Sequence, residues 1–517
     1  MKKLMALLLA AIMTSTLFTA CGVDDGKSSQ ESVPSSNNPE SSASTYMESS
    51  KEEEPNLYAD EVALTWVFPA VADSYPGWDE INAKLNEITK ERINASINVE
   101  MIPLGEYDSK MNMKFTAGEE FDLCFTGAWN PYLPAVSKGA YAELTEDVLS
   151  TYAPDVMAEL NSVVWDAVRV DGKIYGIPLQ QIYVRQTGIR FPTELIEKYN
   201  IDVNSVKTLD DIDVIAKIFK DNEPDVVPIF ANKNAIYNDA INYLGFDVLI
   251  NNFIPGAVRY AEETPVVVNQ FESEEFRNLC LKIREWNQAG FLPADAVTGA
   301  DSVAESDVVG VYFDPAFKPG GAITEGQIRG YDITEIPFGD CAMTTSAIQA
   351  TITAVSATSK NVERAVSFIN ILDSDPETLN LICHGIEGRD YEFVGDKADK
   401  VIKPISEYPG MLSFLIGNVF NEYYTDPLQI GTWEETAEIN ATAKGSCILG
   451  FAFNQESVAT QISQCNAIVE EYVPALACGA VDVEENIATL NKALKDAGVE
   501  EIIKEMQSQV DAWLAAK

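Results

Sequence analysis

Runs of consecutive apolar residues alternate along the chain with stretches in which apolar residues recur every three or four positions. Residues 62–68 are almost continuously apolar, which is typical of a strand buried in a parallel sheet. Residues 81–88 carry isoleucine and leucine at helical spacing, and residues 97–101 alternate as a second strand does. A third apolar run, at residues 121–125, ends shortly before Trp129. This order predicts an α/β fold built on doubly wound sheets.

A second α/β pattern begins after residue 185. Residues 208–211 resemble a capping box at the start of a helix. Residues 226–230 and 308–313 read as strands, and residues 276–286 as a helix that ends near a glycine. The chain therefore contains two α/β units in sequence.

The rest of the chain predicts a return to the first sheet and then a helical region. Residues 331–339 are a candidate strand leading back, and residues 348–355 would complete the first sheet. Asp375 is placed to cap a helix that has proline at its first position and stops at Gly385. The last hundred residues are mainly helical in pattern, with apolar residues at helical spacing from Val499 onward.

The strongest local signal is a hairpin. Asp171 and Gly172 stand between apolar residues, and both positions of such a turn must accept a positive φ. Pro178 follows in the next strand and cannot donate to a central ladder, so this strand should lie at a sheet edge. Residues 180–185 mix β-forming with hydrogen-bonding side chains, which indicates a passage from one lobe to another.

These residues carry a resemblance to a known family. The sequence Asp-Gly-Lys-Ile-Tyr-Gly-Ile-Pro at 171–178 resembles the first interlobe passage of the extracellular solute-binding proteins of ABC importers, above all the sugar-binding, maltose-binding-like branch. Residues 384–392 are similar to a Gly-Ile-Glu-Gly segment of its large lipoprotein-type members. The resemblance implies a two-lobed periplasmic-binding-protein-like fold with three passages between lobes, which we place at 180–185, 339–345 and 409–424.

The resulting division of the chain combines this resemblance with composition. A region rich in Ser, Asn, Glu and Pro cannot bury enough apolar surface to fold, and it is expected to act as a flexible tether. The predicted parts are a lipoprotein signal peptide at 1–20, the tether at 21–57, a first lobe at 58–182 plus 341–408, and a second lobe with the C-terminal helices at 183–340 plus 409–517.

The leader indicates export. Lys2 and Lys3 precede an apolar segment at 4–13 that is too short for a full membrane span. Small residues before Cys21 resemble the bacterial lipobox, which implies that Cys21 is lipidated and becomes the mature N-terminus. The alternative is an ordinary signal peptide cut after Ala20. No later segment reaches about 20 uninterrupted apolar residues, so no transmembrane helix is expected.

Charge and cysteine usage exclude several functions. With 36 Lys and Arg against 80 Asp and Glu, the net charge of −44 would repel nucleic acid and anionic membranes. One histidine, eight cysteines and no Cys-x-x-Cys make a zinc site or a Cys–His pair improbable, and Cys124 and Cys280 read as buried apolar residues. His384 fits the last turn of a helix. We expect no catalytic residue, no metal and no cofactor.

Candidate ligand-binding residues lie at strand ends and on the passages between lobes. Ligands of open α/β sheets sit beyond the carboxyl ends of the strands, and sugar sites combine aromatic faces with polar side chains. Each candidate also has a simpler interpretation as a core or hinge residue. The candidates are Phe68, Asp73, Trp129, Asn130, Gln180, Tyr183, Arg185, Tyr312, Asp314 and Trp433.

The expected function follows from the leader, the tether, the two α/β units and the family resemblance. We expect a monomeric lipoprotein on the extracellular face of a bacterial cell membrane. It would capture a carbohydrate in an interlobe cleft and deliver it to the permease subunits of an ABC importer. The carbohydrate we expect first is an oligosaccharide. The alternatives are a binding protein for a peptide or other polar solute, a secreted glycan-cleaving enzyme and an adhesive surface protein.

Overall fold

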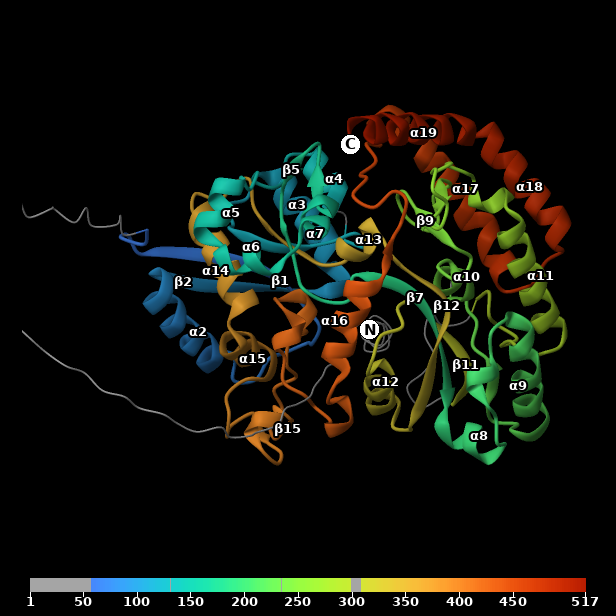
Figure 1. Cartoon of the computed structure of the whole chain (residues 1–517), viewed down its shortest axis with the longest axis horizontal. Helices are drawn as coiled ribbons and strands as arrows, with labels where there is room; N and C mark the ends of the chain where they lie inside the picture. The colour runs from blue at the N-terminus through green and yellow to red at the C-terminus, as the bar shows by residue number, and fades with distance from the viewer. Residues whose placement is uncertain (1–56, 131, 234, 299–307) are drawn as a thin grey trace, which may run out of the picture.

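The computed structural model of the protein describes residues 57–517, except 131, 234 and 299–307. The predicted signal peptide, Cys21 and nearly all of the tether lie outside the described residues. Two five-stranded sheets stand side by side, each with its own hydrophobic core and helices (Figure 1). We call the unit around β1 (Val62–Ala70) the first lobe and the unit around β7 (Val184–Pro192) the second lobe.

The sheet of the first lobe has the strand order β2-β1-β3-β13-β6. The strand β1 pairs in parallel with β2 (Ala95–Pro103) and β3 (Leu123–Thr126), which confirms the three predicted parallel strands. The strand β13 (Ile352–Val355) runs antiparallel to β3 and to β6 (Ile177–Pro178). Because β6 is the last strand in the order, Pro178 lies at the sheet edge as predicted.

Four longer helices cover this sheet, namely α2 (Trp78–Ile93), α3 (Leu104–Ala117), α14 (Val362–Ser374) and α15 (Pro376–His384). Figure 1 shows α2, α14 and α15 on one side of the sheet and α3 on the other. The side chain of Asp375 accepts a hydrogen bond at the start of α15, which ends before a glycine of positive φ. The predicted cap and stop of this helix are therefore confirmed.

The predicted hairpin is present. The strands β4 (Arg169–Val170) and β5 (Lys173–Ile174) pair antiparallel across Asp171 and Gly172, whose φ angles are 51° and 78°. The strand before the turn has only two residues, because the helix α7 (Ser162–Ala167) ends just before it.

The sheet of the second lobe has the order β16-β12-β7-β11-β8. Both long neighbours of β7, namely β11 (Val309–Asp314) and β12 (Ile333–Met343), run antiparallel to it, whereas β8 (Val227–Ile229) and β16 (Lys444–Gly445) add parallel edges. The sheet is thus mixed. The strands predicted at 308–313 and 331–339 are present; each begins one or two residues later than expected and ends later, β11 at Asp314 and β12 at Met343.

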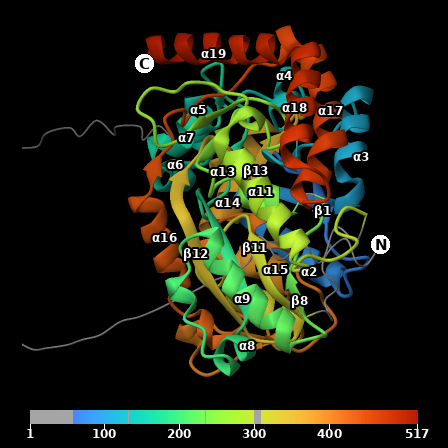
Figure 2. The ribbon, with the colours of Figure 1, turned by 90° about the vertical axis from the view of Figure 1, so that its right-hand side faces the viewer.

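Helices on the second lobe follow the predicted pattern. The capping box at the start of α9 (Leu209–Asn222) is confirmed, and α11 (Glu274–Gln288) buries the apolar face that was expected of residues 276–286. The C-terminal helices α17 (Ala459–Ala477), α18 (Val483–Asp496) and α19 (Val499–Ala516) follow one another around the end of this lobe (Figures 1 and 2). Their apolar faces join the core of the second lobe.

The chain passes between the sheets three times. The first passage joins β6 to β7 and the second joins β12 to β13, each at or within a few residues of its predicted place. The second contains a short helix, α13 (Thr345–Ile348), where the start of a strand was expected. The third passage lies later than predicted. Residues 411–424 are rich in apolar side chains that join the core of the first lobe, so the chain crosses at 425–446, through α16 (Thr432–Thr442).

None of the described helices combines the length and apolar character that crossing a membrane requires. The seven cysteines of the described part of the chain are free thiols. Cys124 and Cys280 are buried in the two cores, as predicted.

A buried ion-pair cluster ties the second lobe together. The guanidinium of Arg190 on β7 is 2% exposed. It lies 2.8 Å from Asp314 of β11, 2.8 Å from Glu335 of β12, and 3.5 Å from Glu325 of α12 (Gly321–Arg329). Burying these charges is costly, and the cost is offset only while each charge keeps its partners. The cluster therefore fixes three strands and a helix to one another.

We expect Arg190→Met to lower the free energy of unfolding by about 3–5 kcal/mol, because it leaves buried carboxylates without their cation. Urea denaturation would measure the change. The matched control is Arg277→Met, since Arg277 is 44% exposed and pairs with Glu484 on the surface. That change should cost less than about 1 kcal/mol. Equal losses in the two variants would contradict the structural importance of the buried cluster.

Candidate functional site

A cavity of about 410 Å³ lies where the two lobes meet. Its walls come from α4 (Tyr132–Ser137) and the preceding loop in the first lobe, from the second passage, and from β9 (Phe246–Val248) and α17 in the second lobe. The main lining residues are Ala128, Tyr132, Leu133, Asp247, Asn251, Thr345, Ser346, Gln349, Phe451, Gln455, Ser463 and Asn466. Both lobes and a passage between them therefore build one cavity.

The end of β3 is fastened to the second passage at this cavity. A Cβ on Gly127 would stand 2.3 Å from the carbonyl oxygen of Ala350, so only glycine permits the close approach of the two backbones. The N–H of Ala128 donates to the carbonyl of Gln349 at 2.7 Å. The side chain of Gln349 in turn donates to the carbonyl of Ala167, also at 2.7 Å. These contacts hold the first-lobe wall of the cavity against the passage.

A second cavity of about 610 Å³ continues the first along the interface. The two share the lining residues Leu133, Pro134, Gln455 and Ala459, so they lie next to each other along the interface, and we call the pair the groove. The second cavity extends to Tyr175, beside the Asp-Gly hairpin. The groove therefore has room for a ligand larger than a single small molecule.

The lining of the first cavity is largely apolar, with scattered neutral polar groups and the carboxylate of Asp247. Tyr132 and Phe451 supply aromatic rings, and the hydroxyl of Tyr132 donates to the carbonyl of Val168 at 2.9 Å. Asn251 and Ser463 add side chains that both donate and accept hydrogen bonds. No set of three His, Cys, Asp or Glu side chains within the described ranges is arranged to hold a metal ion.

The predicted site residues of the first lobe have different surroundings. Phe68 is fully buried and packs edge-on against Trp66, so it contacts no ligand in this conformation. Asp73 is exposed in the loop after β1. Trp129 is 38% exposed, with its ring 5.1 Å from that of Phe125. Asn130 is buried and its amide donates to Asp108. Of these four, Trp129 lies next in the chain to a cavity-lining residue and keeps an exposed face.

The predicted residues of the first passage serve the hinge. The amide of Gln180 donates to Asp373 at 2.9 Å, and the backbone N–H of Tyr183 donates to Asn440 at 2.8 Å. The Tyr183 hydroxyl is buried and donates to a backbone carbonyl. Arg185 is half-buried. Burial lowers the pKa of its guanidinium, although the nearby carboxylate of Asp314 acts in the opposite direction. This packing is the alternative that the sequence left open.

The predicted residues of the second lobe and third passage are buried. Asp314 is a partner of Arg190, and the ring of Tyr312 lies 5.7 Å from the same guanidinium. Trp433, in the first turn of α16, packs against Phe420 at 5.3 Å. The strand β11 extends through residue 314, so both of its candidates face the ion-pair cluster instead of a strand-end loop. The ten predicted residues thus do not converge on one site.

Sequence reasoning missed Lys318, which lies buried between β11 and α12. Burial lowers the pKa of its ammonium group to about 7, against the opposing effects of Asp314, Glu335 and Glu422. Glu422 belongs to the segment that packs on the first lobe, so Lys318 experiences charges of both lobes.

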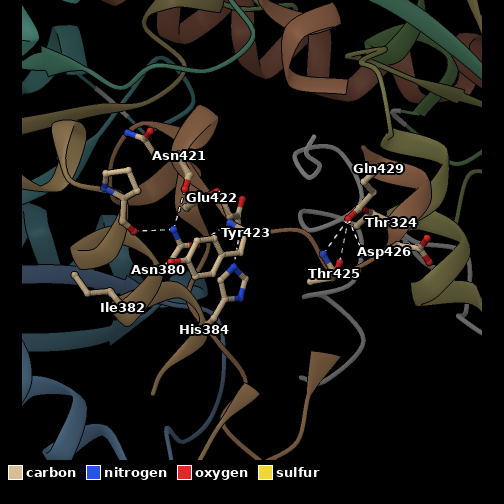
Figure 3. Close-up of polar contacts among 12 residues, drawn as sticks. Thr324, Asn380, Ile382, His384, Asn421, Glu422, Tyr423, Thr425, Asp426 and Gln429 are labelled. Carbon is tan, nitrogen blue, oxygen red and sulfur yellow. Dashed lines mark hydrogen bonds and ion pairs between the residues drawn. The ribbon is translucent and has the colours of Figure 1, made fainter. Parts of the chain in front are cut away.

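Side-chain amides fasten the chain to both lobes where the third passage begins (Figure 3). On the first lobe, Asn380 of α15 donates to the carbonyl of Asn421 at 2.8 Å and accepts from the N–H of Tyr423 at 2.7 Å. Near the second lobe, the amide of Gln429 donates to Thr324 of α12 at 3.4 Å. The nearby His384 lies in the last turn of α15, as predicted, and stacks on Tyr423. The hydrogen bonds of Asn380 and Gln429 and the stacking of His384 hold segments of the chain together.

Asp247 and Gln349 are cavity residues that sequence reasoning also missed. Gln349 stands in a polar stretch between two elements and carries no distinctive pattern. Asp247 could have been found, because it is a single acid flanked by apolar residues on both sides. A charge in such a run is buried, and a buried charge needs a partner or a function.

Two lobes with separate sheets, three passages and a cavity at their junction define a two-lobed solute-binding architecture. Comparison with known proteins agrees. The chain is 28% identical over 453 residues to a carbohydrate ABC transporter substrate-binding protein of Streptococcus pneumoniae, covering 86% of this chain and 90% of that one. It is 23% identical over 374 residues to the lipoprotein LipO of Bacillus subtilis, covering 66% and 72%.

Solved structures give the same result. The N-glycan transport solute-binding protein NgtS of Streptococcus pneumoniae superposes with a TM-score of 0.80 at 27% identity, covering 88% of this chain and 99% of that one. Its complex with Man5GlcNAc gives 0.70, at 27% identity over 89% and 99% of the chains. Residues 447–515 match a domain family of unknown function, DUF3502. The predicted resemblance to solute-binding proteins of ABC importers is confirmed.

Replacing the candidate tryptophans Trp129 and Trp433 should lower the stability of the protein by different amounts. We expect Trp433→Ala to lower the free energy of unfolding by about 3–5 kcal/mol, because it empties a buried, packed position. Trp129→Ala should cost clearly less, since part of that indole already faces solvent. Urea denaturation of both variants would measure the difference. A larger loss for Trp129 than for Trp433 would contradict this assignment.

Proposed function

We propose that this chain is the substrate-binding lipoprotein of an ABC importer that captures an extracellular carbohydrate, in the first instance an oligosaccharide. The ligand enters the interlobe groove, the lobes close over it, and the closed form delivers it to the permease subunits. The protein performs no covalent chemistry on its ligand.

The observation that carries the proposal is the groove built jointly by both lobes and the second passage, in a fold similar over most of its length to NgtS. NgtS is described as an N-glycan transport protein, and complexes with Man1GlcNAc and Man5GlcNAc are known. The mixture of aromatic rings and polar side chains around the groove suits sugar rings, which have apolar faces and hydroxyl edges.

The same structures support lobe closure. The similarity is greater to the NgtS structure named without a ligand, with a TM-score of 0.80, than to the Man1GlcNAc and Man5GlcNAc complexes, at 0.74 and 0.70. Lower TM-scores for the complexes are expected if the two rigid lobes change their relative orientation when a ligand binds. We interpret the present conformation as the open one.

A ligand panel tests the proposal. We expect neutral oligosaccharides such as Man5GlcNAc or kestose to raise the melting temperature of the purified protein, because a ligand that binds only the folded state stabilises it. Calorimetry on the binding members, repeated with Trp129→Ala, should show affinity weakened roughly thirtyfold, as is typical of losing an aromatic anchor worth about 2 kcal/mol. An unchanged affinity would remove Trp129 from the site and leave the proposal intact.

Other outcomes of the same panel favour other functions. Release of new reducing ends from any glycan would contradict the proposal and support a glycan-cleaving enzyme. Stabilisation by oligopeptides alone would support a peptide-binding protein. A protein that no solute stabilises would support an adhesive role.

The anchor is a separate part of the proposal, because Cys21 lies outside the described residues. The leader pattern and the similarity to the lipoprotein LipO support it. We expect Cys21→Ala to release the protein into the medium or to leave an uncleaved precursor, as judged by cell fractionation and band size. A mature-sized band that stays with the membrane would contradict lipid attachment at Cys21.

A further inference from the structure

The cavity between the lobes contains a buried carboxylate with an unused oxygen. Asp247 lies in the middle of β9, which pairs with β10 (Ala257–Arg259), and it is 3% exposed. Its side chain lines the cavity, and one carboxylate oxygen, Oδ2, has no hydrogen-bond partner. Buried carboxylate oxygens are normally satisfied, so an unsatisfied one at a cavity wall needs an explanation.

Asp247 is also the one Asp, Glu, Lys, Arg or His among the described residues that line this cavity. The opposite walls carry neutral groups. On the second passage these are Thr345, Ser346 and Gln349, and on α17 they include Asn466. Among the described residues, Asp247 is therefore the one charge of this cavity, whereas the adjoining second cavity also carries Lys138, Asp171 and Glu456.

Within the described part of the chain, no cation neutralises this charge from the elements packed around it. On the neighbouring strand β10, Arg259 is engaged with Glu275 at 2.7 Å. Ser446, at the end of the third passage, lies close enough to stabilise the carboxylate in part. Burial, and after it the charge of Asp247, raise the pKa of the neighbouring Cys447 thiol. Burial therefore dominates and raises the pKa of Asp247 to about 6. The empty cavity holds a carboxylate that is poorly solvated and incompletely bonded.

We propose that Asp247 is a specificity-determining residue of the cavity, which accepts hydrogen bonds from hydroxyls of a neutral sugar ring and rejects acidic sugars by its charge. The inference rests on the function proposed above. Two adjacent hydroxyls can satisfy both oxygens of one carboxylate, and hydrogen bonds to a charged acceptor are among the strong ones. A ligand lacking these donors leaves the buried oxygen unpaired, which is how a polar site discriminates.

The first test is Asp247→Asn, with Man5GlcNAc as the neutral probe and an oligogalacturonate as the acidic one. We expect the affinity for the neutral probe to fall roughly tenfold to a hundredfold, from the loss of charge-assisted bonds. The unliganded variant should melt about 1–3 °C higher than wild type, because a poorly satisfied buried charge has been removed. A purely structural role for Asp247 would lower the melting temperature.

Asp122→Asn is the matched control. Asp122 is also a buried carboxylate, but it lies away from the cavity and is satisfied by the N–H of Thr65 at 2.8 Å and the hydroxyl of Ser359 at 2.6 Å. Its replacement should lower the melting temperature and leave affinity unchanged. The two variants therefore shift stability in opposite directions.

The second test needs no variant. Ligand hydroxyls favour the ionised carboxylate, so the pKa of Asp247 is lower in the complex than in the free protein, where it is about 6. Affinity should be constant above pH 7 and decrease by up to tenfold per pH unit below 6. The Asp247→Asn variant should show no such decrease.

The outcomes separate the two proposals. If wild type binds Man5GlcNAc but Asp247→Asn binds it equally well, or if affinity increases on acidification, this inference is overturned and the proposed function stands. Tighter binding of the oligogalacturonate than of the neutral probe also overturns it. If wild type binds no member of the carbohydrate panel, both proposals fail.

Discussion

Three passages of the chain join the lobes, and uncharged hydrogen bonds fasten them to one another. Asn440 of the third passage donates to the carbonyl of Gln181 at 2.7 Å and accepts from the N–H of Tyr183 at 2.8 Å. The Gln181 side chain donates to Thr351 of the second passage at 2.6 Å. The three passages are therefore linked to one another at one level, which forms a joint between the lobes. The cavity borders this joint, and the second passage supplies part of its wall.

A joint of this kind works only if the bodies on either side are rigid. In the second lobe the buried charges around Arg190 fix β7, β11, β12 and α12 just beyond the joint. In the first lobe the close approach of Gly127 to Ala350 fixes the end of β3. The ion pairs of Arg190 and the contact between Gly127 and Ala350 both join residues that are far apart in the sequence. Deformation is therefore concentrated in the passages, and closure can bring two preformed walls together.

The sequence predicted the architecture well where local patterns decide it. Buried strands, the Asp-Gly hairpin and capped helices depend on nearby residues, and these elements are present. The third passage was misplaced because residues 411–424 combine apolar and loop-forming side chains, and only packing against the first-lobe core distinguishes a buried segment from a passage. The mixed second sheet was also beyond prediction, since strand direction depends on long-range pairing.

The site was harder to predict because strand-end position alone does not say where a side chain points. Tyr312 and Asp314 are near a strand end, yet both face Arg190 inside the lobe, Asp314 through an ion pair and Tyr312 through its ring. Among the described residues, Asp247 has no such cationic partner, and its Oδ2 accepts no hydrogen bond. In a protein of net charge −44, a carboxylate left alone on a cavity wall lowers the stability of the empty state. A ligand that supplies the missing hydrogen-bond donors removes this energetic cost when it binds. The unsatisfied carboxylate that destabilises the unliganded fold therefore also helps the protein to discriminate between ligands.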